Sequence, residues 1–426
     1  MSFNSIWRNI RWRTRLILWL GACATGLIVV VFAKLSEYAQ NLFFTLLKAQ
    51  PLAPILLTPL IGGGIVWLAQ RYFAGIQGSG IPQVIAATKL AASNKKVSHL
   101  VSLKIAFGKV LLGIAGLLGG FSIGREGPSV QVAASILRFF HQLLPNTRVI
   151  RLSDLLIAGG AAGIAAAFNT PLAGIVFAIE ELGKKLESRT SAILISSIVL
   201  SGLVAISLQG NYQYFGHFSI VGIDRNFLFY IPVIGFTCGI LGGIFSLILL
   251  MPVNYPNFLI WKMRGKHPVI FAVICGLIVV IVGLITHGAT YGNGYDLTGH
   301  IINGGSTDAW WILIGKYVAT ITSYFSGIPG GIFAPSLSIG SAIGGSIYQV
   351  IGQANYLVPI VALCMAGFLA AVTQAPITSA IIVMEMIDGH EMLIGLLAVT
   401  FIAKGVSARI SPELYQRLAM SFITKS

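Results

Sequence analysis

The sequence predicts an all-α membrane protein that crosses the bilayer several times, and three observations support this prediction. Of the 426 residues, 56% are hydrophobic and only 10% are charged, whereas soluble proteins carry about 25% charged residues. The mean hydropathy is +0.85. Apolar stretches recur along the whole chain, and two pairs of motifs repeat at nearly the same spacing, which indicates two related halves.

Apolar stretches of unequal length are the candidate helices: 16–33, 55–69, 110–121, 155–179, 191–208, 227–250, 268–286, 310–321, 356–384 and 392–403. A transmembrane helix needs about 20 apolar residues. Several stretches are long enough, but others are interrupted early by Gly, Pro or a charge. Short helices are tolerated at membrane depth only where protein or a water-filled cavity surrounds them. We therefore expect one polytopic domain with broken helices around a site.

Basic residues cluster at the ends of apolar stretches and give the chain a net charge of +15: Arg8, Arg11, Arg13 and Arg15; Lys95 and Lys96; Lys184 and Lys185; Lys262, Arg264 and Lys266. This distribution is typical of loops that face the cytoplasm. Because the charges flank glycine-rich apolar helices, we expect no nucleic-acid partner. The basic start before 16–33 is similar to a signal peptide, but the run is long and many spans follow, so we predict a retained first helix.

The cysteines and histidines show no pattern of a metal site or a catalytic triad. Cys23, Cys238, Cys275 and Cys364 lie singly in apolar stretches, which favours core packing. The seven histidines have no partner pattern either. A protease built on Ser79 would be a different class of protein, but "QGSG" (77–80) lacks the first glycine of a GxSG motif. We expect no enzyme, no metal and no cofactor.

Two pairs of motifs repeat at nearly one offset. "GREGPSVQVAASI" (124–136) and "GIFAPSLSIGSAI" (331–343) share a Gly followed by Pro-Ser, and they begin 207 residues apart, at 124 and 331. "AAAFNTPLAGIVFAIEE" (165–181) and "AAVTQAPITSAIIVMEM" (370–386) begin 205 residues apart, at 165 and 370. Shared composition alone rarely produces two such pairs.

We therefore predict two homologous halves within the single domain, about 1–205 and 206–426. Duplicated halves with interrupted helices in matching positions are typical of transporters, whose site lies at the interface between the repeats. The sequence does not show whether one repeat is inverted relative to the other.

Three segments rich in Gly and Pro interrupt the apolar pattern: "GSGIPQV" (78–84), "GREGPSV" (124–130) and "GGIFAPSLSIG" (330–340). Glycine permits unusual backbone angles, and proline suits the first turn of a helix. Each segment therefore reads as a loop that leads into a helix N-terminus, where unpaired N–H groups attract anions. Several such ends would hold an anion without full charges, which permits its release. The alternative is that these are simple helix breaks caused by glycine packing.

The motifs "GSGIP", "GREGP" and "GIFAP", in this order and followed by "YQR" (415–417), resemble those of the CLC family of chloride channels and chloride/proton exchangers. The resemblance extends from about residue 30 to residue 418. It implies an all-α membrane domain with two inverted halves of tilted and broken helices. It further implies a homodimer in the lipid bilayer, with a separate pathway for chloride and protons in each subunit.

The resemblance also implies the residues of the anion site. The hydroxyl groups of Ser79 and Tyr415 would face a central anion, which is chloride as substrate. Backbone N–H groups of Ile332 and Phe333 would complete this central site. A second, outer position would use the backbone around Arg125, Glu126 and Gly127, with the Arg125 side chain bracing the loop rather than touching chloride.

Acidic residues inside apolar stretches are costly and are functional candidates. Glu126 stands where an anion is expected, so its carboxylate can occupy the anion position and leave when it is protonated. We interpret it as a gating glutamate. The alternative is an ion pair with Arg125, but adjacent side chains do not face each other on a helix.

Glu181 is similar to the internal proton acceptor of the exchangers in this family, and Glu180 would line the water path to it. Both end an apolar stretch beside Lys184 and Lys185, near the expected cytoplasmic side. For Glu385 we favour a structural role. Lys109 either raises the positive potential at the anion site or pairs with a carbonyl group.

The resemblance leaves related functions to compare. A passive chloride channel, gated by voltage or pH, typically lacks the acid that is present here as Glu181. A fluoride exporter usually replaces the serine of "GSGIP" and alters "GREGP", and neither change occurs. We therefore predict an antiporter of chloride, and of similar anions such as nitrate, against protons.

Two further features bear on the kind of CLC protein. Gln83 stands where many relatives have Glu, which puts an ion pair at that position in doubt. The chain ends soon after Tyr415, so we expect no nucleotide-binding CBS domains. With "GREGP" and short loops, this favours the inner (plasma) membrane of a prokaryote.

Overall fold

The computed structural model describes residues 3–147, 150–183, 191–210, 215–216, 225–305 and 309–424. Within these ranges the secondary structure is helical, apart from two isolated β-bridges between loops. The α-helices are α1 (Phe3–Ala49), α2 (Pro54–Tyr72), α3 (Ile81–Ala92), α4 (Leu103–Leu118), α5 (Glu126–Gln142), α6 (Leu152–Phe168), α7 (Pro171–Phe177), α8 (Ser191–Gln209), α9 (Tyr230–Asn254), α10 (Leu259–Lys266), α11 (Pro268–Ile285), α12 (Tyr295–Ile302), α13 (Ala309–Phe325), α14 (Phe333–Ile351), α15 (Leu357–Thr373), α16 (Pro376–Ile387), α17 (Leu393–Ile410) and α18 (Leu414–Ile423).

Four short helical segments complete the description. Three are 3₁₀-helices: η2 (Arg225–Phe229), η3 (Ala354–Tyr356) and η4 (His390–Met392). The fourth, η1 (Ala178–Gly183), is a π-helix that continues α7. π-Helical turns are rare in proteins, and those that occur often lie at functional sites.

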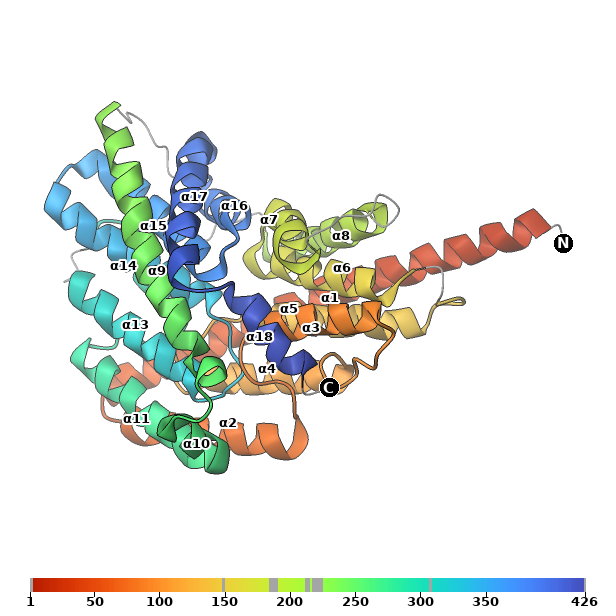
Figure 1. Cartoon of the computed structure of the whole chain (residues 1–426), viewed down its shortest axis with the longest axis horizontal. Helices are drawn as coiled ribbons and strands as arrows, with labels where there is room; N and C mark the ends of the chain where they lie inside the picture. The colour runs from red at the N-terminus through yellow and green to blue at the C-terminus, as the bar shows by residue number, and fades with distance from the viewer. Residues whose placement is uncertain are drawn as a thin grey trace.

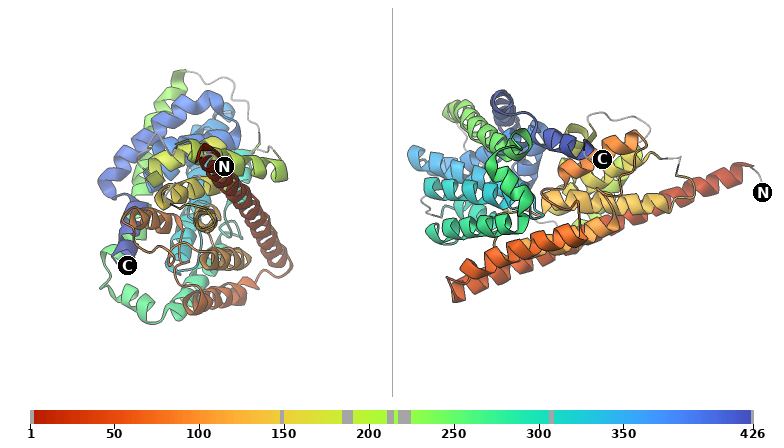
Figure 2. Two further views of the ribbon diagram at one scale, coloured as in Figure 1. Left: turned by 90° about the vertical axis from the view of Figure 1, so that its right-hand side faces the viewer. Right: turned by 60° about the horizontal axis from the view of Figure 1, so that its bottom comes forward.

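The helices of the two predicted halves occupy different parts of the molecule (Figure 1). In this view α3 to α8 lie toward the right, whereas α9 and α13 to α17 lie toward the left. The last helix, α18, crosses between them and packs against α3 and α9. The long helix α1 runs along one side of the body and extends beyond it at its N-terminal end (Figure 2).

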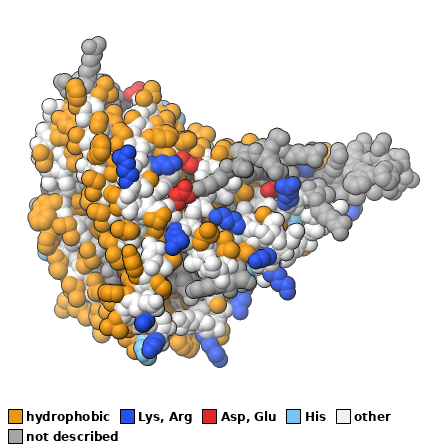
Figure 3. All heavy atoms as spheres, viewed as in Figure 1, with side chains coloured by type: hydrophobic (Ala, Val, Ile, Leu, Met, Phe, Trp, Pro, Cys, Tyr) orange, Lys and Arg blue, Asp and Glu red, His pale blue; other side chains and the backbone are white. Residues whose placement is uncertain are grey.

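Four helices of the described chain are long and apolar enough to cross a membrane: Trp12–Ala49, Phe227–Asn254, Pro268–Ile285 and His390–Ile410. Other apolar helices are shorter, among them Leu152–Phe168 and Leu357–Thr373. Hydrophobic side chains cover the left of the face shown in Figure 3, whereas Lys and Arg lie in its middle and at its lower right. The predicted polytopic membrane protein with broken helices is confirmed.

Two of the predicted apolar stretches are each divided into two helices at matching positions. The stretch 155–179 breaks between α6 and α7, and 356–384 breaks between α15 and α16. At the breaks, Asn169 and Gln374 have positive φ angles of 58° and 60°. Asn is one of the residues that tolerates this conformation at a helix end, and the proline two positions later starts the next helix.

Glu180 and Glu385 make matching contacts across these breaks. The carboxylate of Glu180 accepts hydrogen bonds from the N–H groups of Ile377 (3.1 Å) and Thr378 (2.7 Å), in the first turn of α16. The carboxylate of Glu385 accepts them from Leu172 (3.4 Å) and Ala173 (2.8 Å), in the first turn of α7. Each carboxylate thus caps the helix N-terminus of the other half.

This reciprocity is what a local two-fold axis produces, because residue i then contacts j while the equivalent of j contacts the equivalent of i. A second reciprocal pair supports the same axis. Gly124 and Gly331, which are the first glycines of the repeated motifs, exchange N–H···O bonds of 2.7 Å in both directions. The position of the boundary between the halves, near residue 205, stays a prediction.

We expect the two glutamate caps to contribute to stability. Replacing a helix-capping acceptor with alanine costs about 1 kcal/mol. Glu385→Ala should therefore lower the melting temperature of the purified protein in detergent. Glu385→Gln keeps one acceptor oxygen and should lower it less, which makes it the matched control. Equal melting temperatures for Glu385→Ala and the parent protein would show that the cap does not stabilise the fold.

Candidate functional site

Backbone hydrogen bonds join the three loops that the sequence singled out. Gly78 donates to the carbonyl of Ile328 (3.2 Å), and Gly330 donates to the carbonyl of Gly78 (3.1 Å). The Gly124–Gly331 pair joins the other two loops. Each loop leads directly into a helix, and these are α3, α5 and α14. The predicted convergence of helix N-termini is therefore present in the structure.

Glycine at position 127 permits the closest of these approaches. A Cβ atom there would collide with the Ser79 hydroxyl and lie 3.0 Å from the Ser79 carbonyl oxygen. A Cβ atom on Gly331 would lie 2.9 Å from the backbone nitrogen of Gly127. Side chains at these positions would push the loops apart, so the first turn of α5 contacts the loop before α3 only because Gly127 has no side chain.

Ser79 and Tyr415 come together from opposite ends of the chain. Ser79 is 3% exposed and Tyr415 is 1% exposed. Among the described residues, no hydrogen bond is formed by Ser79 Oγ or by the Tyr415 hydroxyl, although the two groups lie close enough to interact. The Tyr415 ring stacks on Phe333, with 6.1 Å between ring centroids and an interplanar angle of 11°.

Ile332 and Phe333 begin α14 beside these hydroxyl groups, and both are buried. The first N–H groups of a helix have no partner within the helix. The start of α14 therefore presents backbone donors near Ser79 and Tyr415. This places Ser79, Ile332, Phe333 and Tyr415 together as the sequence predicted, while their role in binding an anion stays a prediction.

Glu126 is completely buried at the start of α5. Its Oε1 accepts a hydrogen bond of 2.8 Å from the hydroxyl of Tyr295. The carboxylate interacts with the backbone N–H groups of Glu126 itself and of Ala334, at the start of α14. Its Oε2 lies over the Cα atom of Gly124, where a Cβ would collide with it. The carboxylate therefore lies between two helix N-termini, in a position suited to an anion.

The side chain of Arg125 hydrogen-bonds to α1. Its guanidinium donates to the carbonyl of Ala33 on α1. It still contributes a positive charge that acts on Glu126. This geometry ties the loop before α5 to α1.

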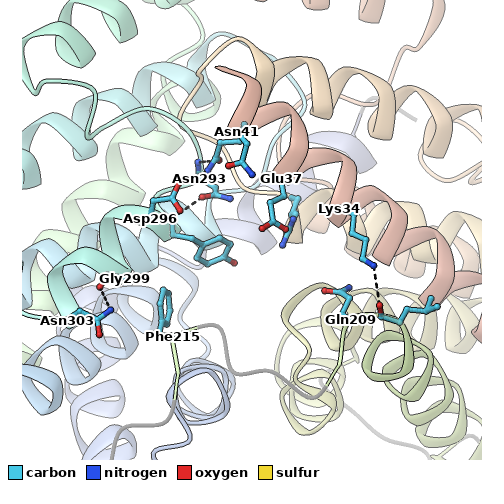
Figure 4. A pocket seen from close by; sticks show the side chains of 13 residues that line it. Lys34, Glu37, Asn41, Gln209, Phe215, Asn293, Asp296, Gly299 and Asn303 are labelled. Carbon is cyan, nitrogen blue, oxygen red and sulfur yellow. Dashed lines mark hydrogen bonds between the residues drawn. The ribbon is translucent and has the colours of Figure 1, made fainter. Parts of the chain in front are cut away.

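Two pockets that share no lining residue each include a residue that contacts the first turn of α5: Tyr295 contacts Glu126, and Ser79 lies against Gly127. The first, of about 580 Å³, is shown in Figure 4 and includes Tyr295, Arg125, Glu37 and Asp296 in its lining; we call it the Tyr295 pocket. The second, of about 550 Å³, includes Ser79, Arg264 and Arg417; we call it the Ser79 pocket.

Glu181 lies in the π-helix η1 and is buried. Its carboxyl group interacts electrostatically with the hydroxyl of Tyr415. The same hydroxyl interacts with Glu126. Tyr415 is thus within electrostatic range of two carboxyl groups that are 55 residues apart in the chain, at 126 and 181. Lys184 and Lys185, which the sequence analysis used to orient Glu181, lie outside the described residues.

The neighbouring Glu180 has different partners, because it caps α16. A role in proton transfer for Glu180 stays a prediction, as does the role of Glu181 as acceptor. For Glu385, the hydrogen bonds to α7 supply the structural contact that was favoured for it.

Lys109 and Gln83, whose roles the sequence left undecided, support the loop before α3. The ammonium group of the buried Lys109 donates to the carbonyls of Ile76 and Gly78, both at 2.6 Å. Gln83 accepts from the N–H of Gly80 (3.1 Å) and donates to the carbonyl of Gln77 (2.6 Å). Gln83 therefore fixes the loop through hydrogen bonds that need no charge.

Tyr295 and Lys316 were not predicted from the sequence. The buried Lys316 donates to the carbonyls of Thr290 (3.1 Å) and Gly292 (2.8 Å), just as Lys109 does in the first half. The two lysines are 207 residues apart, at 109 and 316, which is the offset of the first repeat. The signal was therefore present in the sequence. The matching hydrogen bonds of the two lysines also make the "GNG" of 292–294 the counterpart of the "GSG" of 78–80, although these two loops are 214 residues apart, at 78 and 292.

The N-termini of broken helices meet around buried hydroxyl and carboxyl groups, between two pockets. This arrangement defines a class of polytopic membrane protein with a polar site in its interior. The chain belongs to the voltage gated chloride channel family, because the model of that family matches residues 61–408. The resemblance to the CLC family that the motifs indicated is thereby confirmed.

Three solved structures share the fold over nearly the whole chain. A slow cyanobacterial Cl⁻/H⁺ antiporter aligns with a TM-score of 0.83 and 23% identity, over 97% of this chain and 99% of that chain. A CLC-type fluoride/proton antiporter aligns with a TM-score of 0.79 and 21% identity, over 98% of this chain and 99% of that chain. A eukaryotic CLC transporter aligns with a TM-score of 0.77 and 19% identity, over 96% of this chain and 74% of that chain. The predicted CLC fold is confirmed.

Proposed function

We propose that this protein exchanges chloride, or a similar anion such as nitrate, for protons across the membrane. The observation that carries the proposal is the buried hydroxyl of Tyr415, which lies close to Ser79 and within electrostatic range of Glu126 and Glu181. One hydroxyl group thus belongs to the proposed anion site and interacts electrostatically with both proposed proton-carrying groups. Two of the structures with the same fold are described as proton-coupled antiporters, of Cl⁻ and of fluoride.

The anion would bind between the hydroxyls of Ser79 and Tyr415 and the N-terminus of α14. Buried polar groups normally have a hydrogen-bond partner. Ser79 Oγ and the Tyr415 hydroxyl have none among the described residues, and an anion would accept from both. Because these donors carry no full charge, the anion can leave again.

Glu126 would act as the gate between the Ser79 pocket and the Tyr295 pocket. Its charged carboxylate occupies a place between the starts of α5 and α14, where it competes with a transported anion. Protonation removes this charge and with it the attraction to the helix N-termini. The neutral side chain then swings out, the anion passes, and the proton is carried with the side chain. Glu181 would exchange protons with the other side of the membrane.

The arginines Arg264 and Arg417 of the Ser79 pocket suggest its orientation, because basic residues favour the cytoplasmic side. We propose that this pocket opens to the cytoplasm and that the Tyr295 pocket faces outward. We further propose that the protein lies in the plasma membrane of a prokaryote and forms a homodimer with one pathway in each subunit. We propose no enzymatic reaction.

A passive chloride channel is the second candidate, and Glu181 is the feature that separates the two. A channel needs no second proton-carrying group. Yet a buried carboxyl group beside Tyr415 is costly, which favours a function for it.

The test is a flux experiment on the purified protein in liposomes, with chloride and proton movement recorded together. In the exchanger, a chloride gradient drives protons uphill, whereas a channel passes chloride without moving protons. Replacing chloride with fluoride in a parallel series tests whether the selectivity resembles that of the fluoride/proton relative. Uphill proton movement with chloride and none with fluoride is the expected result.

The anion site itself predicts the effect of Tyr415→Phe. This change removes the hydroxyl but keeps the ring that stacks on Phe333. A hydrogen bond to a charged group contributes about 1.5 to 3 kcal/mol, so chloride affinity measured by calorimetry should fall by about tenfold or more. Tyr317→Phe is the control, since the Tyr317 hydroxyl donates to the carbonyl of Leu241 and not to a group of the proposed anion site. Unchanged affinity in Tyr415→Phe would count against the assignment.

A further inference from the structure

The hydroxyl of Tyr295 is the side-chain donor that contacts Glu126 from the second half of the chain. The bond is 2.8 Å long and joins residues 169 positions apart. Tyr295 is half-buried and lines the Tyr295 pocket, while Glu126 is completely buried. The tyrosine hydroxyl therefore stands between the pocket and the carboxylate that the proposed function identifies as the gate.

The backbone of Tyr295 is held firmly at the start of α12. Its N–H donates to Asn293 Oδ1 (2.9 Å), and the N–H of Asn293 donates to Gln40 Oε1 on α1 (3.0 Å). Gln40 also donates through Nε2 to Asp296 (3.2 Å). Lys316 holds the carbonyl of Gly292 in the same loop. These bonds fix the start of α12 against α1 and α13, so the hydroxyl of Tyr295 is held in place by its loop as well as by Glu126.

The two "GxG" loops give this arrangement a counterpart in the first half. Gly78 and Gly80 have φ angles of 70° and 107°, and Gly292 and Gly294 have 66° and 90°. Each loop is held by a buried lysine and precedes a helix. The first-half loop brings the Ser79 hydroxyl to the Ser79 pocket, and the second-half loop brings the Tyr295 hydroxyl to the Tyr295 pocket.

We propose that Tyr295 is a positioning residue for the gate: its hydroxyl holds the Glu126 carboxylate between the starts of α5 and α14 and thereby slows each opening. This inference rests on the proposed gating role of Glu126. Opening must break the bond between Tyr295 and Glu126, in addition to separating the carboxylate from the helix N-termini. A hydrogen bond to a charged group is among the stronger ones in proteins. Tyr295 therefore lowers the rate of anion passage.

The charged and titratable groups around this pair are few among the described residues. Arg125 precedes Glu126, and the hydroxyl of Tyr415 on α18 interacts with it electrostatically. Lys34 and Glu37 on α1 and Asp296 on α12 line the Tyr295 pocket. A change of the Tyr295 hydroxyl leaves all of these charges in place, so its effect on the pH dependence of flux reports on Glu126.

The test is Tyr295→Phe in liposomes, assayed for chloride flux over a range of pH. The phenylalanine keeps the ring that packs on Phe215, with 6.0 Å between centroids. Loss of one hydrogen bond to a carboxylate should raise the chloride flux about tenfold. It should also move the pH of half-maximal flux upward by about one unit, because the bond favours the charged carboxylate.

Two further variants separate this role from a general structural one. Tyr291→Phe is the matched control: the Tyr291 hydroxyl donates to the carbonyl of Val280 and has no contact with Glu126. It should leave the flux and its pH profile unchanged. In a Glu126→Gln background, Tyr295→Phe should have no more than a small effect on flux, because the charged acceptor is gone.

Faster flux, a shifted pH profile and the loss of both effects in the Glu126→Gln background support the proposal. Unchanged or slower flux in Tyr295→Phe overturns it, as does an equal acceleration in both backgrounds. The exchanger proposal is tested separately, by uphill proton movement in the parent protein. A parent protein that passes chloride without protons would refute the exchanger, while the comparison of Tyr295→Phe with its controls would still decide the role of Tyr295.

Discussion

Glu126→Gln should leave chloride flux running and make it independent of pH. Glutamine has the size of the protonated glutamic acid, has no charge at any pH, and keeps an oxygen that accepts from the Tyr295 hydroxyl. The attraction between a carboxylate and the starts of α5 and α14 disappears, so the site stays open to anions. Proton movement coupled to chloride should fall to background, because the side chain no longer carries a proton. Chloride efflux from liposomes, measured from acidic to neutral pH, checks both expectations.

Glu37→Gln is the matched control for this prediction. Glu37 lines the Tyr295 pocket and is exposed, so the change removes a carboxylate of this pocket without touching the proposed gate (Figure 4). We expect the pH profile of this variant to match that of the parent protein. If Glu126→Gln keeps the parent's pH profile while Glu37→Gln loses it, the pH-sensitive gate is in the pocket and not at residue 126.

The fold was predictable where Gly- and Pro-rich segments interrupt the apolar stretches. Gly and Pro in the three motif segments predicted the starts of α3, α5 and α14, and the structure places helix starts at Ile81, Glu126 and Phe333. The matched breaks before Pro171 and Pro376 were not predicted, because 155–179 and 356–384 each read as one apolar stretch, although the second repeat aligns the two prolines. These features are local, because the backbone preferences of Gly and Pro act within a few residues.

Contacts between the halves were harder to predict, because no local pattern specifies them. Lys109 and Lys316 each hold two loop carbonyls, but each lysine alone reads as an expensive charge in an apolar stretch. Only their shared offset relates them. Tyr295 carried no signal of its own, since its partner Glu126 lies on another helix and in the other half.

The repeat also locates the asymmetry of the site. At the offset of 207, Glu126 corresponds to Phe333, and Arg125 corresponds to Ile332. The local two-fold axis passes between Gly124 and Gly331, so the two helix starts that face each other carry an acid on one side and a phenylalanine on the other. One carboxylate therefore occupies the junction of two equivalent helix ends. The single gate that we propose would follow from this difference in sequence and not from the symmetric backbone.

Glu180 and Glu181 could not be separated by sequence, because they are adjacent acids at the end of one apolar stretch. Adjacent residues of a helix point in different directions. In η1, Glu180 faces the first turn of α16, whereas Glu181 is buried and interacts with Tyr415. This difference in partners gives the two acids different expected roles, which the following variants test.

Glu181→Gln should abolish coupled proton flux while chloride flux persists. A glutamine at this position cannot take up or release a proton, so the proposed path from Glu126 past Tyr415 ends there. The groups of the proposed anion site, Ser79, Tyr415 and the start of α14, are unchanged. The decisive measurement is the reversal potential of this variant in a planar bilayer under gradients of chloride and pH. For a protein that passes chloride alone, this potential equals the chloride Nernst value.

Glu180→Gln is the control that the neighbouring acid provides. Its amide oxygen still accepts from the first turn of α16, so the contact between the halves is weakened and not lost. Coupled proton flux should slow but remain, because water can replace one polar group along a path more readily than it can replace a proton acceptor. The reversal potential of Glu180→Gln should therefore stay displaced from the chloride Nernst value. A displacement that persists in Glu181→Gln as well would show that protons still couple to chloride and that Glu181 is not their internal acceptor.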